Sequence, residues 1–573
     1  MINLKINNIE VSVPEGTTIL EASRANGINI PTLCNYPDLG IKAECRVCVV
    51  EIEGRRGLST SCSTICEDGM VVKTNTPDVI TARRTITQLL LADHDVDCPS
   101  CPKNLNCELQ ELANRLNIVD NPFDHVEFPQ PVDEDNPSII RNPNRCIKCG
   151  RCIEVCREVQ GIDVLEYMGR GVSEAITPAF GRKLNDLFCT YCGQCTSVCP
   201  VGAIVEKDDT DLVFQAINDP SKHVIVQTAP AIRVSLGEEN GMNAGTVVTG
   251  KLVSALRALG FDEVFDTDFT ADLTIIEEGN ELIQRITTGG VLPMMTSCCP
   301  GWINFAEQEF PEILPNISSC KSPQQMFGAL AKSYYAEKIG VNPKDLFVVS
   351  IMPCTAKKYE CKREEMQVNK GIQDVDVVLT TRELGKMIRQ VGIDFENLKE
   401  SEFDAPFGIT TGAAAIFGAT GGVMEAAVRT VYEVVNKEEL KSLDFKGLRG
   451  LDGIKEATVT LGGQEVKVAV CHTLSKARIL AEQVKNGTSP YAFIEVMACP
   501  GGCIGGGGQP YGTVNKIRSK RIDATYNVDK DMPIRKSHEN PAIKSIYENY
   551  LEKPLGHKSH HLLHTTYTSR NKN

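Results

Sequence analysis

The stretch Thr296-Ser-Cys-Cys-Pro-Gly-Trp302 contains the only tryptophan of a 573-residue chain and an adjacent cysteine pair, Cys298 and Cys299. A disulfide needs Cβ atoms that converge, so adjacent cysteines bridge poorly and the pattern favours two separate roles. Two other stretches are similar in style, Met352-Pro-Cys-Thr355 and Glu495-Val-Met-Ala-Cys-Pro-Gly-Gly-Cys503. Each places cysteine beside proline or glycine, on a tight loop whose backbone can closely approach a bulky inorganic group. The four thiolates that suffice for a cubane iron–sulfur cluster are Cys299, Cys354, Cys499 and Cys503.

These three motifs closely resemble the active-site signatures of the iron-only (FeFe) hydrogenases, and the resemblance covers essentially the whole chain. It implies an H-cluster, in which a 4Fe-4S cubane shares one cysteine thiolate with a two-iron unit carrying carbon monoxide, cyanide and a bridging dithiolate. By this resemblance the four thiolates hold the cubane, and Cys503 supplies the shared one. Cys298 matches the cysteine that passes protons, since a thiol can act as a general acid or base. The alternative for Cys298 is an inert buried cysteine.

Other polar and sulfur-bearing side chains also match family positions. Met352, Lys357 and Met497 match positions near the two-iron unit, where a lysine can hydrogen-bond a cyanide; for the methionines the alternative is core packing. The resemblance further implies a proton path made of Glu278, Glu281, Ser318 and Arg285. On a helix over residues 275–285 the three charged members fall at i, i+3 and i+7, along one face. The alternative is a solvated face with an ordinary i, i+4 ion pair.

Charge and composition bound the function further. The net charge of −14 argues against nucleic-acid and anionic-membrane partners, because binding to either requires basic patches. Neither a signal peptide nor a membrane-length apolar run is visible, so we expect a cytoplasmic protein. Twenty-four cysteines in such a chain indicate metal ligation rather than a disulfide framework.

Residues 1–78 are predicted to form a ubiquitin-like 2Fe-2S ferredoxin domain. Alternating apolar residues predict two strands, and Thr18 and Glu21 have the spacing of a capping box at the start of a helix. Four cysteines follow as C-x10-C-x2-C-x13-C, which resembles the 2Fe-2S domain of the large iron–sulfur subunit of respiratory complex I: Cys34, Cys45, Cys48 and Cys62. Cys66 falls outside this pattern and is expected to be a buried hydrophobe.

Residues 79–118 are predicted to form a second cluster domain, with a helix over residues 80–91. Its candidate ligands follow the pattern H-x3-C-x2-C-x5-C: His94, Cys98, Cys101 and Cys107. Zinc accepts three cysteines and one histidine and is the alternative. Beside a domain of complex I character, the spacing resembles that family's His-ligated 4Fe-4S cluster.

After a proline-rich linker at 119–137, residues 138–209 contain an internal repeat of C-x2-C-x2-C-x3-C. This is the run of two-cluster ferredoxins, in which the fourth cysteine of each run ligates the other cluster. One predicted 4Fe-4S set is Cys146, Cys149, Cys152 and Cys199. The other is Cys189, Cys192, Cys195 and Cys156.

Residues 210–515 alternate apolar runs (224–226, 346–352, 466–470) with amphipathic stretches (251–259, 322–338), which predicts an α/β domain with parallel strands. All proposed H-cluster ligands then lie at loops or strand ends, where such sheets bind ligands. Residues 516–573 are predicted to be a helical arm resembling a hydrogenase small subunit, with structural or exposed histidines. The predicted fold class is therefore multidomain α+β and α/β.

The sequence thus predicts a hydrogenase that interconverts protons, electrons and H2, with one 2Fe-2S cluster, three 4Fe-4S clusters and an H-cluster. The expected partners are ferredoxin, flavin- and NAD(P)-binding subunits, or both, together with maturation factors that load the two-iron unit. The chain has no G-x-G-x-x-G fingerprint, so nicotinamide chemistry must belong to a partner. The alternatives are a stand-alone ferredoxin hydrogenase and a non-catalytic hydrogenase-like iron–sulfur protein.

Overall fold

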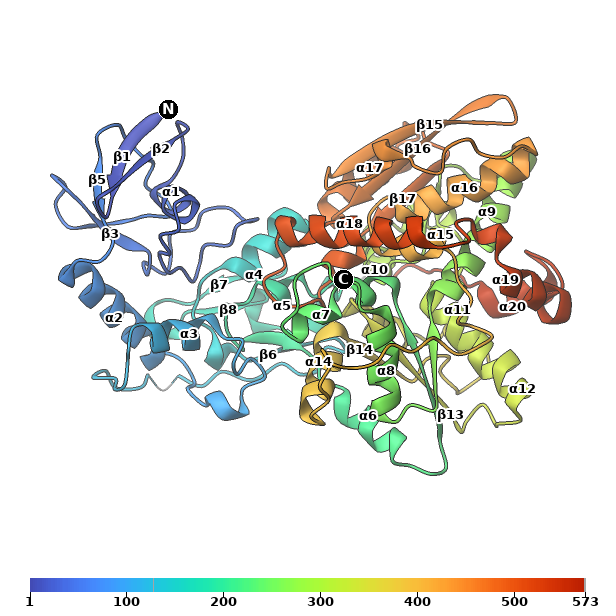
Figure 1. Ribbon diagram of the computed structural model, residues 1–573, viewed down its shortest axis with the longest axis horizontal. Helices are drawn as coiled ribbons and strands as arrows, with labels where there is room; N and C mark the ends of the chain where they lie inside the picture. Colours follow the sequence, from blue (N-terminus) through green and yellow to red (C-terminus); the bar gives the residue numbers. More distant parts are fainter. Residues whose placement is uncertain (127, 571–573) are drawn as a thin grey trace. The chain divides into compact units, whose positions relative to one another are not determined.

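The structure is a computed structural model, described for residues 1–126 and 128–570. The last three residues of the predicted segment 516–573 lie outside this range. The chain divides into two compact units (Figure 1). Unit 1 consists of Met1–Glu158, Asp163–Leu187 and Val198–Val205, and unit 2 consists of Val159–Ile162, Phe188–Ser197 and Glu206–Asn573. No helix in the described part of the chain is long and apolar enough to span a membrane.

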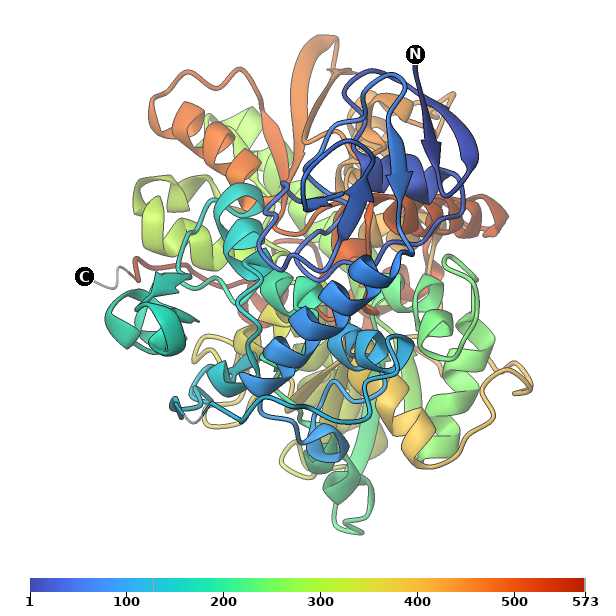
Figure 2. The same cartoon turned by 90° about the vertical axis from the view of Figure 1, so that its left-hand side faces the viewer.

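Unit 1 begins with a five-stranded sheet of order β2-β1-β5-β3-β4. Its strands are β1(Ile2–Ile6), β2(Ile9–Val13), β3(Val49–Ile52), β4(Leu58–Thr60) and β5(Val71–Lys73). The predicted capping box is confirmed, because Thr18 and Glu21 exchange hydrogen bonds at the start of α1(Ile19–Ala25). In Figure 2 the sheet (dark blue) faces the viewer with the following helix, α2(Pro77–Ala92), in lighter blue. The helix predicted at 80–91 therefore exists and is longer, since Thr76 caps it and Pro77 suits its first turn.

The remainder of unit 1 consists of short elements around cysteine-bearing loops. They include α3(Glu108–Arg115), β6(Ile139–Arg141), α4(Arg151–Glu154), the π-helical turn η3(Val155–Val159), and the hairpin β7(Glu166–Met168) and β8(Ala175–Thr177). Regular structure is sparse here because the loops, and not a continuous sheet, carry the candidate ligands.

Unit 2 contains a parallel four-stranded sheet of order β11-β10-β13-β14. The strands are β10(His223–Thr228), β11(Glu263–Asp266), β13(Leu346–Met352) and β14(Val377–Thr380). Nearly all their side chains are buried, as expected for parallel strands covered on both faces. The parallel prediction is confirmed for this sheet.

The second sheet of unit 2, of order β12-β17-β16-β15, departs from that prediction. Its strands are β12(Met294–Met295), β15(Ile454–Leu461), β16(Gln464–His472) and β17(Phe493–Met497). β15 and β16 pair antiparallel, because only Gly462 and Gly463 connect them and a two-residue glycine turn closes a hairpin. A parallel pair would need a long crossover.

Alternation along β16 explains how this sheet is buried on both faces. Val468 and Val470 pack into one hydrophobic cluster with α16(Gly422–Asn436) and α9(Asp268–Thr288). Ala469 and Cys471 pack into another with α10(Pro300–Glu309) and α17(Leu474–Lys485). Figure 1 shows α16 and α17 on opposite sides of the strands. The strand ends beneath these helices lead into the cysteine loops.

Further helices of unit 2 surround the two sheets. They are α6(Thr210–Ile217), α7(Leu236–Glu239), α8(Thr249–Leu259), α11(Pro323–Leu330), α12(Ala336–Ile339), α13(Ala356–Glu360), α14(Thr381–Gln390) and α15(Gly412–Ala415). Ser322, at the start of the predicted amphipathic stretch 322–338, caps α11, and a π-helical turn, η9(Ala331–Tyr335), joins α11 to α12. The C-terminal arm comprises α18(Asn515–Asp531), α19(Pro541–Ile546), the π-helical turn η14(Tyr547–Leu551) and α20(His557–Leu563).

A buried ion network attaches this arm to the rest of unit 2. The Arg429 guanidinium on α16 donates to both carboxylate oxygens of Asp529, each at 2.9 Å, and to Glu425 Oε1 at 2.7 Å. All three side chains are completely buried. Removing Arg429 would delete these three buried hydrogen bonds and leave Glu425 and Asp529 to Arg449 and Arg535, which are only partly buried. Losing a cation from a buried ionic network is strongly destabilising.

We therefore expect Arg429→Leu to lower the free energy of unfolding by about 3–5 kcal/mol relative to the unsubstituted chain. Denaturant unfolding followed by circular dichroism measures the change. The control is Arg257→Leu, which breaks the exposed pair with Asp404 at 3.0 Å and should cost less than about 1 kcal/mol. Equal effects of the two substitutions would contradict a structural role for the buried network.

Candidate active site

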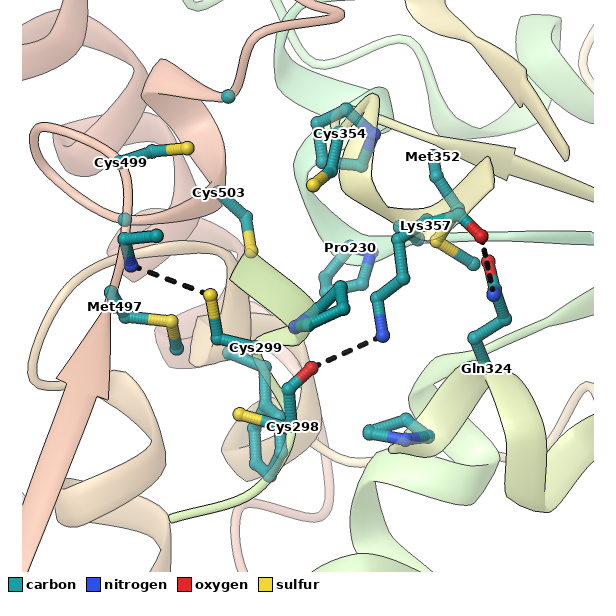
Figure 3. Close-up of a pocket in the computed structure, with 18 of the residues that line it drawn as sticks. Pro230, Cys298, Cys299, Gln324, Met352, Cys354, Lys357, Met497, Cys499 and Cys503 are labelled. Atoms are coloured by element: carbon teal, nitrogen blue, oxygen red, sulfur yellow. Dashed lines mark hydrogen bonds between the residues drawn. The ribbon is translucent and has the colours of Figure 1, made fainter. Parts of the chain in front are cut away.

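A cavity of about 80 Å³ in unit 2 is lined by all five cysteines of the three sequence motifs. Figure 3 shows the sulfur atoms of Cys299, Cys354, Cys499 and Cys503 directed toward a common space. Most of the remaining lining is apolar, including Met352 and the other predicted methionine, Met497. Four thiols facing one another without forming a disulfide suit a thiolate-ligated metal cluster.

The strand ends determine where these cysteines lie. Cys354 follows β13, Cys499 follows β17, and Cys503 begins the 3-10 turn η12(Cys503–Gly505). Cys299 is the N-cap residue of α10, which continues with Pro300. The sequence prediction that all four lie at loops or strand ends is confirmed.

Glycines allow the backbone to close around this space. Gly502 has φ +91°, and a Cβ atom there would lie 2.7 Å from the Thr420 nitrogen. A Cβ on Gly506 would lie 2.2 Å from the Pro353 oxygen. Both positions therefore exclude side chains, so the loop bearing Cys503 can approach the loop bearing Cys354.

Cys298 and Lys357 lie side by side at the cavity wall (Figure 3). The Lys357 ammonium donates to the Cys298 carbonyl oxygen at 3.1 Å and to Glu360 Oε2 at 2.8 Å. Burial alone would lower the pKa of Lys357, but the Glu360 carboxylate more than offsets this, so its pKa is raised. Burial, reinforced by the charge of Glu278, raises the pKa of the Cys298 thiol well above its usual value. The wall thus combines a permanent cation with a protonated thiol.

The four predicted proton-path residues form a connected group on α9 and the loop that follows η8(Pro311–Asn316). Ser318 Oγ donates to Glu281 Oε2 at 3.0 Å, and Arg285 donates to Glu281 Oε1 at 2.6 Å. The Ser318 hydroxyl also hydrogen-bonds the Glu278 carboxyl. Burial, assisted by the charge of Glu281, raises the pKa of Glu278 to about 8. This carboxyl can therefore bind and release a proton near neutral pH.

A loop carrying three cysteines of the predicted second ferredoxin set packs against the cavity loops. The Gln194 amide donates to the Gly505 oxygen at 3.0 Å, and Thr355 Oγ1 donates to the Tyr191 oxygen at 2.7 Å. A Cβ atom on Gly507 would lie 2.3 Å from the Cys192 oxygen. The cysteines on this loop are Cys189, Cys192 and Cys195, and the fourth predicted member, Cys156, lies on η3 of unit 1. The loop that carries Cys189, Cys192 and Cys195 is therefore in backbone contact with the loop that follows Cys503.

Unit 1 brings together two other predicted cysteine sets. Cys48 Sγ lies 3.4 Å from Cys62 Sγ, and the Cys34 and Cys45 thiols hydrogen-bond each other. A separate small cavity is lined by the four cysteines of the first ferredoxin set: Cys146, Cys149, Cys152 and Cys199. Cys66 packs within the hydrophobic cluster of the five-stranded sheet.

His94 is buried and keeps one ring nitrogen unused. Its ring hydrogen-bonds the backbone of Arg145, while Nδ1 has no hydrogen-bond partner among the residues that the structure describes. Burial lowers the pKa of His94, so the imidazole is neutral. A neutral histidine that hydrogen-bonds the backbone through one ring nitrogen can bind a metal through the other. The three cysteines predicted to share its site, Cys98, Cys101 and Cys107, are half-buried nearby in sequence.

Some residues at the site were not predicted as functional. Gln324 lines the cavity with a buried Oε1 that lacks a hydrogen-bond partner in the described part of the chain. Ser319 donates from its backbone and side chain to Glu281, each at 3.1 Å. His564, predicted to be structural, contacts Ser319. Adjacency to Ser318 could have suggested Ser319, whereas Gln324 and His564 carry no motif.

Five cysteines around a mostly apolar cavity, with further cysteine sets elsewhere, define an iron–sulfur oxidoreductase with several clusters. The chain is 52% identical to the NADP-reducing hydrogenase subunit HndD of Solidesulfovibrio fructosivorans, over 100% of this chain and 99% of that protein. It therefore belongs to the iron-only (FeFe) hydrogenases and carries 2Fe-2S and 4Fe-4S clusters and an H-cluster.

Two other comparisons agree. Iron hydrogenase 1 of Clostridium pasteurianum is 42% identical over 98% of this chain and 99% of that protein. A solved structure of a variant of the FeFe-hydrogenase HydA1 from Chlamydomonas reinhardtii is 43% identical, with a TM-score of 0.58, and covers 63% of this chain and 99% of that one.

Family profiles match consecutive parts of the chain. Residues 222–507 match "Iron only hydrogenase large subunit, C-terminal domain", and residues 515–570 match "Iron hydrogenase small subunit". Residues 1–77 match a 2Fe-2S iron-sulfur cluster binding domain. Residues 83–122 match the NADH-ubiquinone oxidoreductase-G iron-sulfur binding region, and residues 136–205 match the ferredoxin-like domain of NADH-quinone oxidoreductase subunit 3.

The raised pKa of Glu278 predicts a specific pH dependence of stability. An unfolded chain releases this proton near pH 4.5, whereas the folded chain retains it until about pH 8. The free energy of unfolding should therefore fall by roughly 3–5 kcal/mol as pH rises across this interval, and Glu278→Gln should remove that loss. Urea unfolding at several pH values measures it, and an infrared carboxylic-acid band that disappears near pH 8 identifies the group. The exposed Glu337→Gln serves as control, and a band that persists in Glu278→Gln would assign the titration to another residue.

Proposed function

We propose that this hydrogenase is the catalytic subunit of an NAD(P)-linked complex, with its H-cluster in the cysteine-lined cavity. The observation that carries the proposal is the meeting of four thiols at one buried space, with a fifth thiol, Cys298, on its wall beside Lys357. Four thiols suit the cubane, and the fifth is left for another task. The glycine contacts around Gly502 and Gly506 fit a bulky group held by closely approaching loops.

In this proposal the cubane is held by Cys299, Cys354, Cys499 and Cys503. The H-cluster supplies the redox chemistry that joins two protons and two electrons into H2, and Cys503 would provide the thiolate shared between its two parts. The protein positions the group and adjusts its electrostatics. Met352 and Met497 exclude water with their apolar side chains, since both line the cavity and are nearly inaccessible to solvent.

Lys357 acts as a fixed hydrogen-bond donor. Its ammonium has three donors, of which the Cys298 carbonyl and the Glu360 carboxylate take two. The third is available to an anionic ligand such as cyanide inside the cavity. Because Glu360 and burial keep the side chain in place, binding such a ligand costs little conformational entropy.

Protons follow Arg285, Glu281, Ser318 and Glu278 to the Cys298 thiol. A protonated Glu278 can give its proton to Ser318 Oγ while the Ser318 hydroxyl proton moves to Glu281, and the reverse sequence carries a proton inward. Glu278 Oε1 has no hydrogen-bond partner among the described residues, which leaves it free to exchange a proton with the thiol. We treat the two carboxyl groups, the Ser318 hydroxyl and the Cys298 thiol as the groups that carry the proton. Arg285 stays charged and holds Glu281 by a hydrogen bond.

The proposed domains 1–78, 79–118 and 138–209 would hold one 2Fe-2S cluster and three 4Fe-4S clusters, which would supply electrons to the active site. The Cys192 loop, which contacts Gly505 to Gly507, provides the last step into the domain at 210–515. The orphaned Nδ1 of His94 supports a His-ligated cluster in the second domain. A histidine in place of a thiolate removes one negative charge from that cluster and changes its reduction potential.

The partner of this electron chain is proposed to be a flavin- and NAD(P)-binding subunit, with ferredoxin as a second electron carrier. Support comes from the relative named as an NADP-reducing hydrogenase subunit and from the complex I-like profiles at 83–122 and 136–205. The alternative is a stand-alone enzyme that uses ferredoxin, which the similarity to Iron hydrogenase 1 favours. Maturation factors would load the two-iron unit in either case.

Cys298→Ser tests the proton-transfer role. We expect H2 evolution to fall by about 10²- to 10⁴-fold while the iron content is unchanged, because the thiol acts as a general acid without holding the cubane. Cys361→Ser makes the same chemical change at a buried cysteine that packs in a hydrophobic cluster away from the cavity and donates to the Lys358 carbonyl at 3.3 Å, and it should retain activity. Full H2 turnover in Cys298→Ser would exclude the proposed role.

The electron donor tests the partner. The matured chain alone should evolve H2 from an artificial one-electron donor, and from NAD(P)H only after the partner subunits are added. H2 evolution is measured with reduced ferredoxin and with NAD(P)H in parallel. Fast turnover from ferredoxin by the chain alone would favour the stand-alone alternative, and turnover from NAD(P)H without any partner would contradict both.

A further inference from the structure

We propose that His564, on the C-terminal arm, holds a proton beside the active-site path and exchanges it with Glu281 through the Ser319 hydroxyl. The inference rests on the proton path proposed above, and it gives the arm a part in the reaction. Its basis is a hydrogen-bonded group in which ring, thiol and carboxylate atoms of His564, Cys320 and Glu281 all lie within 4.8 Å of one another.

The arm reaches this position by pairing with the loop that carries Ser318 and Ser319. His564 forms an antiparallel bridge with Cys320. The Lys321 nitrogen donates to the Leu563 oxygen at 2.7 Å, and the Thr565 nitrogen donates to the Ser319 oxygen at 2.8 Å. The two backbone hydrogen bonds of this bridge fix the position of the imidazole relative to the serine hydroxyls.

The His564 ring then joins Glu281 through a single hydroxyl. His564 Nδ1 lies 2.8 Å from Ser319 Oγ, which lies 3.1 Å from Glu281 Oε2. The Ser319 backbone nitrogen also donates to this oxygen at 3.1 Å, which holds the carboxylate in line. Ser319 has one hydroxyl proton, so it can donate to Glu281 or to His564 but not to both.

Contacts on the other side of the ring decide which nitrogen carries the proton. His564 Nε2 lies 3.1 Å from Glu277 Oε2, which also accepts from the Leu555 nitrogen at 2.8 Å. The Tyr547 hydroxyl donates to the other oxygen of Glu277. An ionised carboxylate can only accept hydrogen bonds, so the Nε2 atom that faces it carries a proton. In neutral His564, Nδ1 is therefore the acceptor and faces Ser319.

This geometry permits a balanced transfer of one proton. When His564 is doubly protonated, its Nδ1–H bond breaks and the proton moves to Ser319 Oγ, while the Ser319 O–H bond breaks and that proton moves to Glu281 Oε2. The reverse transfer reloads the ring, and no electron moves. Because each H2 needs two protons, a second proton held next to Glu281 is available as soon as the first has moved inward.

Several titratable or charged groups face this site and contribute to its protonation. They are Glu277, Glu278, Glu281 and Arg285 on α9, Cys320 beside Ser319, Tyr547 on η14, and His557 and His560 on α20. The exposed His560 ring stacks on the buried His564 ring at 4.7 Å between centroids. Burial and the neighbouring His564 lower the pKa of His560.

Variants of Ser319 and His564 test the proposal in the matured full-length enzyme. Ser319→Ala and His564→Gln should each slow H2 evolution by roughly tenfold at alkaline pH, where proton supply limits the rate, and much less at acidic pH. The double variant should be no slower than either single one, because both break the same transfer. Ser319→Thr restores the hydroxyl and should restore the rate. The exposed His561→Gln, on the same helix, should match the parent.

A spectroscopic readout separates proton exchange from simple packing. In the oxidised full chain with 15N-labelled histidine rings, the Nδ1 resonance of His564 should shift on Glu281→Gln. The shift should be absent when Ser319→Ala is also present, because the hydroxyl carries the coupling. A purely structural His564 would respond to Glu281→Gln equally in both backgrounds.

Parent-like rates in both Ser319→Ala and His564→Gln across the pH range would overturn the proposal, as would a Ser319-independent shift of Nδ1. Loss of rate in Ser319→Thr equal to that in Ser319→Ala would also overturn it. If these variants keep the parent rate while Glu278→Gln and Cys298→Ser abolish turnover, the main path stands and only the His564 branch fails. If Glu278→Gln and Cys298→Ser keep full turnover, the proposed path itself fails, and this branch with it.

Discussion

The convergence of four thiols on one buried space constrains the rest of unit 2. Burial raises the pKa of each of these cysteines, which means that the protein alone disfavours the four thiolate charges there. In the proposed site, iron would compensate by binding the thiolates, which would link the stability of this region to cofactor loading. The two sheets, with their ends at the cavity, and the glycines at 502 and 506 make the convergence possible without side-chain clashes.

Helix α9 shows the same conflict between stability and chemistry. It places Glu277, Glu278 and Glu281 in the interior, where carboxylates are costly. Glu281 is paired with Arg285 and two serines, and Glu277 with the C-terminal arm. One oxygen of Glu278 has no hydrogen-bond partner among the residues that the structure describes. Glu278 is the least compensated of the three acids, and burial, together with its charge, raises the pKa of the Cys298 thiol. Perturbed groups of this kind are typical of functional sites.

Two of the attachments between the C-terminal arm and this core are buried and ionisable. Asp529 joins Arg429 in a fully buried network, and His564 joins Glu277 in another. The first attaches the arm to α16 and the second attaches it to α9. Both helices also pack on the second sheet. The arm is therefore integral to unit 2, and it closes the outer side of the serine loop through backbone pairing.

Several elements of the fold could be predicted from local sequence. The capping box at Thr18, the cap at Ser322 and the strands at 346–352 and 466–470 follow from side-chain chemistry within a few residues, and all are present. The general prediction of parallel strands in residues 210–515 was wrong for the pair β15 and β16. Periodicity reports which face of a strand is buried but not the direction of its neighbour, whereas the Gly462-Gly463 turn does report it.

The sequence by itself determined which residues can bind metal, because ligand type and spacing are local properties of cysteine loops. It also determined the family, since three motifs of unusual composition occur together. Only the tertiary structure decided how Cys298, Lys357 and the acids of α9 relate, and that His564 meets Ser319 from 245 residues away. The reason is physical: a lone histidine or serine has no local signature, and its chemistry depends on burial and on partners that the folded chain brings within hydrogen-bond distance.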